Sequence, residues 1–200
     1  MSRIPDKKQY AKMCELYRDW NEKINVVSRK DIDNLFEHHI LHSLAIRRYM
    51  EEHGLLEDGL EFFDLGTGGG FPGIPLAFTM PECHFTLCDS IAKKVKVAKA
   101  VAKDLKLNNV TCVNSRAENL PGPYDWVISR AVTSLDAFYP WVKGKFRKGI
   151  LYLKGGDVLS EIEEMCVKCK VDPGKVSVWP INDWLKDDYF AEKFVIEIRK

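Results

Sequence analysis

Two aspartates and a group of closely spaced glycines are the residues best able to form a ligand site in this chain. Asp64 ends the apolar run that begins at Leu60, and glycines follow at every second position from Gly66 to Gly70. Glycines let the backbone approach a ligand without a Cβ in the way, and a helix start presents free N–H groups to a nucleotide. A second apolar run ends at Asp89, 23 positions after Gly66. That is close to the offset of about 20 residues at which a carboxylate accepts ribose hydroxyls, so a nucleotide-like ligand is indicated.

The spacing of Gly66, Gly68 and Gly70 distinguishes between two ligands. NAD sites usually have G-x-G-x-x-G, whereas this loop has G-x-G-x-G after an acid. With Asp64 and Asp89, the loop resembles the S-adenosylmethionine site of Rossmann-like methyltransferases. Simpler explanations exist, since a glycine turn can be only a tight connection, Asp89 can cap the next helix, and Asp64 can be a solvated carboxylate. The combination favours a ligand site, because both acids end neighbouring predicted strands at the edge where open α/β sheets bind ligands.

The elements that would position these residues alternate between strands and helices. We predict strands near 60–64, 84–89, 109–113, 125–129 and 149–153, and helices near 73–79, 91–106, 134–145 and 157–168. This alternation indicates an α/β fold with a mostly parallel sheet. Strands near 175–180 and 190–198 have no clear helix between them. We expect them to form a C-terminal antiparallel hairpin that completes a seven-stranded, Rossmann-like sheet.

The chain before residue 55 has a different, helical pattern. Apolar residues recur with a helical period over residues 6–24, and a second helix follows that Asp31 or Asp33 would cap. The glycines at 54 and 59 indicate the junction. We therefore expect a helical extension, residues 1–55, and a Rossmann-like methyltransferase domain, residues 56–200.

Composition indicates a soluble, globular protein. The 200 residues are 46% hydrophobic with a net charge of +1, and no apolar run approaches the roughly 20 residues that span a bilayer. The first residues have no apolar segment after their charges, so we expect no signal peptide, a cytoplasmic location and reduced cysteines. We expect the protein to act as a monomer without membrane contact.

Two groups of residues could suggest a metal. Cys166 and Cys169 form a lone C-x-x-C without a second pair or a nearby histidine. His38 and His42 could share a helix face, but no carboxylate or cysteine completes a ligand set at usable spacing. We expect no metal site, and we expect His39 to be a partly buried histidine among apolar neighbours.

The predicted helix at 91–106 has one basic face. Its lysines, opposite an apolar face, are Lys96, Lys99, Lys103 and Lys106. Such a stripe can be only a solvated surface, or it can attract RNA phosphates.

Several further segments carry a family resemblance that covers nearly the whole chain. The chain resembles the bacterial small-subunit (16S) rRNA guanine-N7 methyltransferases, also called the glucose-inhibited division protein B family. The matching segments are Asn25-Val-Val-Ser28, His39-Ile-Leu-His-Ser-Leu44, Asp64 to Pro75, Leu87-Cys-Asp-Ser90 with Lys93-Lys94, Ser115-Arg-Ala-Glu118, Asp125 to Val132, and Leu153-Lys-Gly155. The chain departs from the family at His38 and His42, where Arg and Asp are more usual, and at Gly69, where a small residue or Pro is frequent.

The resemblance implies an activity and a set of site residues. The activity is methyl transfer from S-adenosylmethionine to N7 of one guanosine in small-subunit rRNA. Asp89 would hold the ribose, Ala117 and Glu118 would border the adenine, and Arg130 and Lys154 would face the methyl group and the RNA in catalytic roles. The full set implied for the cofactor is Asp64, Gly66, Thr67, Gly68, Gly70, Phe71, Asp89, Ser90, Ala117, Glu118 and Arg130.

The implied reaction explains why no general base is evident in the sequence. Guanine N7 has a free lone pair and no proton to lose, so the enzyme must mainly align the reacting atoms. Arg130 is then expected to bind a phosphate or guanine O6, or else to form a structural ion pair with a neighbour such as Glu118. Lys154 could be only a solvated strand-end charge, and Phe71 and Phe138 are expected in the core.

Other activities are open from the residues alone. They are a methyltransferase for another small-molecule or protein acceptor, an NAD(P)-dependent oxidoreductase, and an RNA-binding module without catalysis. The oxidoreductase lacks its G-x-G-x-x-G spacing and a hydride-handling residue.

Overall fold

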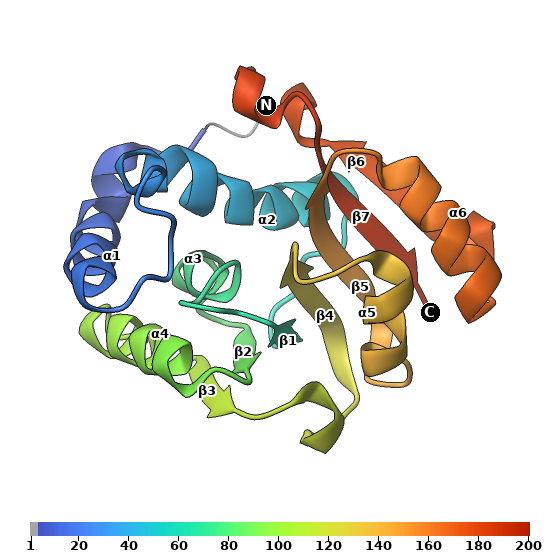
Figure 1. The fold of residues 1–200 in the computed structure, drawn as a ribbon, viewed down its shortest axis with the longest axis horizontal. Helices are drawn as coiled ribbons and strands as arrows, with labels where there is room; N and C mark the ends of the chain where they lie inside the picture. The colour runs from blue at the N-terminus through green and yellow to red at the C-terminus, as the bar shows by residue number, and fades with distance from the viewer. Residues whose placement is uncertain (1–3) are drawn as a thin grey trace.

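The computed structural model describes residues 4–200 and contains a seven-stranded sheet between two layers of helices (Figure 1). The strand order is β3-β2-β1-β4-β5-β7-β6, in which β7 is antiparallel to both its neighbours and the remaining pairs are parallel. The strands are β1 (Glu61–Leu65), β2 (His84–Asp89), β3 (Val110–Asn114), β4 (Tyr124–Arg130), β5 (Phe146–Gly155), β6 (Val176–Pro180) and β7 (Lys193–Arg199). The predicted fold class, with its C-terminal antiparallel hairpin, is confirmed.

The helices divide between the two faces of the sheet. One face is covered by α1 (Ala11–Lys23), α2 (His42–Glu52), α3 (Gly73–Thr79) and α4 (Ala92–Asp104), and the other by α5 (Leu135–Val142) and α6 (Val158–Cys169). Short 3-10 helices are Lys7–Tyr10, Ile32–Asn34, Ala117–Asn119, Pro173–Lys175, Ile181–Asp183 and Asp188–Phe190, and Leu35–Leu41 is π-helical. Within residues 4–200, no helix has both the length and the apolar character needed to cross a membrane.

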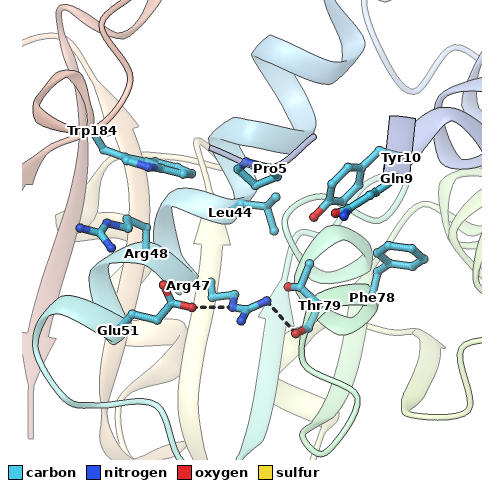
Figure 2. Close-up of a pocket in the computed structure, with 10 residues that line it drawn as sticks. All are labelled: Pro5, Gln9, Tyr10, Leu44, Arg47, Arg48, Glu51, Phe78, Thr79 and Trp184. Atoms are coloured by element: carbon cyan, nitrogen blue, oxygen red, sulfur yellow. Dashed lines mark hydrogen bonds and ion pairs between the residues drawn. The ribbon is translucent and has the colours of Figure 1, made fainter. Parts of the chain in front are cut away.

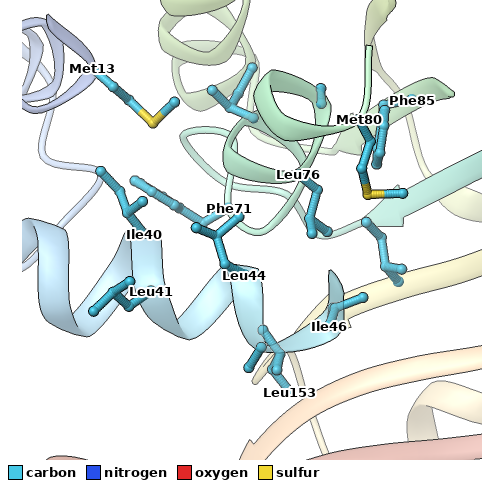
Figure 3. Close-up of a cluster of buried hydrophobic side chains, with 14 of the residues drawn as sticks. Met13, Ile40, Leu41, Leu44, Ile46, Phe71, Leu76, Met80, Phe85 and Leu153 are labelled. Carbon is cyan, nitrogen blue, oxygen red and sulfur yellow. The ribbon is translucent and has the colours of Figure 1, made fainter. Parts of the chain in front are cut away.

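Alternating side chains of β1 supply both cores. Phe62 belongs to the cluster under α1 to α4, whereas Phe63 belongs to the cluster under α5 and α6. Figure 3 shows where α1, α2 and α3 meet, with Met13, Leu44 and Phe71 converging in the first cluster. The helices before β1 therefore share a core with the sheet, and the division of the chain at residue 55 stays a prediction.

The second N-terminal helix begins differently from our expectation. Residues 32–34 are a 3-10 turn, residues 35–41 are π-helical, and α2 starts only at His42. No side chain caps these starts, so the predicted cap at Asp31 or Asp33 is wrong. Instead, the carboxylate of Asp31 contacts the rings of His38 and His39.

Candidate active site

A cavity of about 530 Å³ opens beside the carboxyl ends of β1, β2 and β4. This is the edge at which parallel α/β sheets bind ligands. The lining residues are Leu65, Gly66, Asp89, Ser90, Ile91, Lys94, Ser115, Arg116, Ala117, Glu118, Arg130, Ala131, Val132 and Trp141. Of the predicted site residues, the cavity wall brings together Gly66, Asp89, Ser90, Ala117, Glu118 and Arg130. The wall does not include the predicted Asp64, Thr67, Gly68, Gly70, Phe71 or Lys154.

Asp89 joins the two loops beside the cavity. Its Oδ2 accepts a hydrogen bond from the Gly68 N–H at 2.9 Å, and its Oδ1 accepts one from the Ile91 N–H at 2.8 Å. The second bond fits the capping explanation, but a carboxylate has about four acceptor positions. Asp89 therefore keeps positions for ribose hydroxyls while it holds the glycine loop.

The glycine loop depends on backbone conformations that favour glycine. Gly66 has φ +72° and Gly68 has φ +58°. A Cβ on Gly66 would lie 2.4 Å from Val132 Cγ2, whereas a Cβ on Gly68 would meet no atom within 4 Å. The absence of a Cβ at Gly66 thus lets the Val132 side chain, on the opposite wall of the cavity, pack directly against the loop.

Asp64 lies beneath the loop and is fully buried. Its Oδ2 accepts hydrogen bonds from the Thr67 hydroxyl at 2.6 Å and from the Gly73 N–H at 2.8 Å. Burial raises the pKa of Asp64 to about 7. In this structure Asp64 and Thr67 support the loop from below.

Arg130 is a half-buried cation at the end of β4. Its Nη2 lies 3.1 Å from Nδ1 of His39, and its guanidinium lies 5.0 Å from the ring centre of Phe71. Within residues 4–200, Arg130 has no ion pair with Glu118 or another carboxylate. A cation held this way, without a matching anion, fits a ligand that brings negative charge or a carbonyl oxygen.

Lys154 is paired rather than solvated. Its ammonium contacts Glu161 at 2.8 Å and donates to the carbonyl of Thr133 at 2.8 Å. Tyr152 supports the same segment, because its hydroxyl contacts the backbone of Val132 and Thr133. Lys154 therefore fixes the segment after β4 that forms one cavity wall.

Phe71 and Phe138 are both buried, as we expected. Phe71 lies in the glycine loop and stacks on Tyr17 of α1, with 4.5 Å between ring centres. Phe71 thus links the core to the site through Arg130.

Three exposed, large apolar side chains of the cavity wall were not among the predicted site residues. Ile91, Val132 and Trp141 keep 41%, 39% and 37% exposure, whereas most large apolar side chains of this protein are buried. They offer apolar surface beside the adenine end expected at Ala117 and Glu118. Two of them had a signal in the sequence: Ile91 lies two positions after Asp89, and Val132 ends the family-like segment that begins at Asp125. Together with the free acceptor positions of Asp89, these surfaces fit S-adenosylmethionine.

No metal site accompanies this cavity in the described part of the chain. Residues 4–200 contain no group of three or more His, Cys, Asp or Glu that could hold a metal ion. The six cysteines are free thiols.

A second cavity, of about 390 Å³, lies between the N-terminal segment, α2 and the end of α3 (Figure 2). Arg47 bridges Glu51 and the carbonyl of Thr79, and Arg48 pairs with Glu52. Both cations near this cavity are therefore already matched, which makes it a weaker candidate for a ligand site than the cavity beside Asp89.

Comparison with known proteins agrees with this geometry. A sequence model of the GidB family, described as rRNA small subunit methyltransferase G, matches residues 6–183. The chain is 46% identical over 198 residues to "Ribosomal RNA small subunit methyltransferase G" of Flavobacterium psychrophilum, covering 95% of this chain and 89% of that protein. It is also 46% identical to the protein of the same name from Christiangramia forsetii, covering 94% and 87%.

The solved structures show the same fold at low sequence identity. Magnesium protoporphyrin IX methyltransferase from Synechocystis PCC 6803, with bound S-adenosylmethionine, superposes with a TM-score of 0.67, 16% identity and complete coverage of both chains. This places the fold among class I S-adenosylmethionine-dependent methyltransferases. By its sequence, the chain belongs to the GidB family, rRNA small subunit methyltransferase G.

Proposed function

We propose that this protein transfers the methyl group of S-adenosylmethionine to N7 of one guanosine in small-subunit ribosomal RNA. The observation that carries the proposal is the position of Arg130, an unmatched cation on the wall of a cavity that fits the cofactor. Family membership supports the same acceptor. The bound cofactor would supply a methyl group on a positively charged sulfur.

The residues around the cavity suit a reaction that needs alignment and no general base. Guanine N7 attacks with its own lone pair, so no group has to remove a proton. Arg130 retains N–H donors for a phosphate or for guanine O6, and either contact would hold N7 in register. Lys154 acts by holding the segment after β4 in place.

Each half of the cofactor has a complementary surface. The two free acceptor positions of Asp89 suit the ribose hydroxyls, and the adenine end is bordered by Ala117, Glu118 and Ser90.

The methionine half of the cofactor would approach the turn that is formed by Gly66, Gly68 and Gly70. Asp64, Thr67 and Phe71 hold that turn from below.

The substrate is small-subunit rRNA, free or within a ribosomal subunit, and the protein acts on it as a cytoplasmic monomer. A net charge of +1 favours a subunit whose proteins help to position the RNA.

The decisive test is methyl transfer from labelled S-adenosylmethionine to small subunits from cells that lack the modification. Chemical cleavage at 7-methylguanosine then locates the product. A single modified guanosine supports cofactor, acceptor and atom together. Cofactor binding without transfer would instead assign the same cavity to a methyltransferase with another acceptor.

A further inference from the structure

Asp31, His39 and Arg130 form a chain of contacts that leads from the N-terminal segment to the cavity. Asp31 Oδ2 lies 2.5 Å from His39 Nε2, and His39 Nδ1 lies 3.1 Å from Arg130 Nη2. The contact between His39 and Arg130 joins residues 91 positions apart, from the π-helix and the end of β4.

The chemistry of the partners assigns the protons in this chain. A carboxylate only accepts hydrogen bonds and a guanidinium only donates them. His39 must therefore donate through Nε2–H to Asp31 and accept at Nδ1 from Arg130, which requires the neutral ring protonated at Nε2. Burial, followed by the charge of Arg130, lowers the pKa of His39 to about 4, so the ring is neutral near pH 7.

Asp31 is itself fixed in place. Its Oδ1 lies 2.5 Å from His38 Nδ1, and the His38 ring stacks on Tyr189 with 3.6 Å between ring centres. Burial would raise the pKa of Asp31, but the hydrogen bonds from His38 and His39 outweigh it and hold this pKa below its usual value. The acceptor for His39 is thus charged and anchored.

The guanidinium of Arg130 contacts two side chains and has further N–H donors without a side-chain partner within residues 4–200. His39 accepts a hydrogen bond from one of the five N–H donors of Arg130, and the Phe71 ring centre lies 5.0 Å from the guanidinium. His39 is its one side-chain hydrogen-bond partner within residues 4–200. The remaining donors are available to a ligand in the cavity that Arg130 lines.

We infer that Asp31 and His39 are positioning residues for methyl transfer. Asp31 fixes the tautomer of His39, and His39 fixes the guanidinium of Arg130 in the orientation that receives the acceptor nucleotide. This inference rests on the proposed function, because the orientation of Arg130 matters only if Arg130 binds the nucleotide that accepts the methyl group. It also gives a role to π-helical winding, a rare geometry that is frequent at functional sites and that here directs both histidines to one carboxylate.

Two substitutions of His39 separate its two contacts. In His39→Asn the amide oxygen can take the place of Nδ1 and accept from Arg130, but the side chain is too short to reach Asp31. In His39→Gln the amide nitrogen can take the place of Nε2 and donate to Asp31, but nothing accepts from Arg130. His84→Gln, at an exposed histidine of β2, is the matched control.

The measurements are kcat and KM for small subunits, the affinity for S-adenosylhomocysteine by calorimetry, and Tm. We expect His39→Gln to lower kcat/KM by at least about tenfold, mainly through KM for the subunit, with cofactor affinity within about twofold of wild type. His39→Asn should retain most of the activity, and His84→Gln all of it. Wild-type activity in His39→Gln, or equal losses in both His39 variants, would overturn the inference.

A second measurement is independent of the acceptor. Nitrogen NMR of histidine-labelled protein reports which ring nitrogen of His39 carries the proton. We expect protonation at Nε2 in the wild type and a smaller share of this tautomer in Asp31→Ala, where only the contact with Arg130 still selects it. Protonation at Nδ1 in the wild type would overturn the inference. Subunits left unmethylated by the wild type would instead count against the proposed function alone.

Discussion

The hydroxyl of Tyr17 donates a hydrogen bond to the carbonyl oxygen of Gly69 at 3.0 Å, which ties α1 to the glycine loop. Tyr17 is fully buried, and its ring stacks on Phe71 of the same loop. The N-terminal helix therefore supports the loop that would carry the cofactor, although no residue of α1 lines the cavity.

Removal of the Tyr17 hydroxyl should weaken both the fold and cofactor binding. Tyr17→Phe leaves the Gly69 carbonyl without its buried partner, which costs about 1–3 kcal/mol in the free energy of unfolding. Urea denaturation and calorimetry with S-adenosylhomocysteine measure the two effects. Tyr139→Phe is the control, since that hydroxyl makes no hydrogen bond within residues 4–200. Equal effects of the two substitutions would contradict the support of the loop by Tyr17.

Two glycines of the loop should differ in their tolerance of alanine. Both have positive φ, so each substitution carries a backbone penalty of about 1 kcal/mol. Only Gly66→Ala also places its Cβ 2.4 Å from Val132 Cγ2. We expect Gly66→Ala to lose cofactor affinity and Gly68→Ala to lose mainly stability, as calorimetry and thermal unfolding can show. Partial recovery of Gly66→Ala by Val132→Ala would identify the clash as the cause.

Asp64 should make stability depend on pH. Because its folded-state pKa is raised to about 7 from 3.8, its contribution is fully present below the unfolded pKa and is lost as pH rises through about 7. A shift of this size corresponds to at most about 4 kcal/mol. Asp64→Asn cannot titrate and keeps an oxygen for Thr67 and Gly73. Its free energy of unfolding relative to the wild type should therefore rise between about pH 5 and about pH 8. The same difference at both pH values in urea titrations would count against a raised pKa.

Arg130→Lys should impair RNA use more than cofactor binding. Lysine keeps the charge but loses the planar fork that contacts His39 and Phe71 and that we propose to contact the acceptor. We expect kcat/KM for small subunits to fall by roughly tenfold to a hundredfold, with the affinity for S-adenosylhomocysteine almost unchanged. Near-normal methyl transfer by this variant would refute the proposed role of the fork.

The lysine stripe of α4 should contribute to RNA binding through charge. Lys96, Lys99 and Lys103 are exposed and have no ion pair within the described residues, while the apolar face of α4 is buried. Along the helix axis the three span about 10 Å, a reach that suits successive phosphates. Changing all three to Glu should weaken rRNA binding and lower its salt dependence by about two units of log–log slope.

The control for the stripe is the triple Glu variant of Lys170, Lys175 and Lys200, which are exposed near α6 and β6. Fluorescence anisotropy over a range of salt concentrations compares the two. Identical slopes for both triple variants would show that the stripe on α4 is only a solvated surface.

Local patterns predicted the part of the site that is local in sequence. The glycine loop is recognisable because it directly follows a strand, and Asp89 because it ends one. Parallel pairing of β1 with β2 then brings them together. The predicted helix at residues 73–79 agrees with α3.

The contacts of Asp31 and His39 could not be predicted in this way. Asp31 precedes a helix and has the usual features of a cap, but its partners arise from π-helical winding, which has no established sequence signal. The partner of Arg130 is 91 positions away, so only tertiary packing determines it. The exposure of Trp141 beside the cavity depends likewise on where α5 packs.

The place of β7 has a consequence for the newly synthesised chain. As the last strand in sequence, β7 nevertheless lies inside the sheet, with β5 on one side and β6 on the other. Until the ribosome has released Lys193–Arg199, β5 keeps an unpaired edge and β6 has no partner. Unpaired edges attract other strands, so chains truncated before Lys193 should aggregate. Synthesis must therefore have passed Arg199 before the sheet that positions the cavity can be complete.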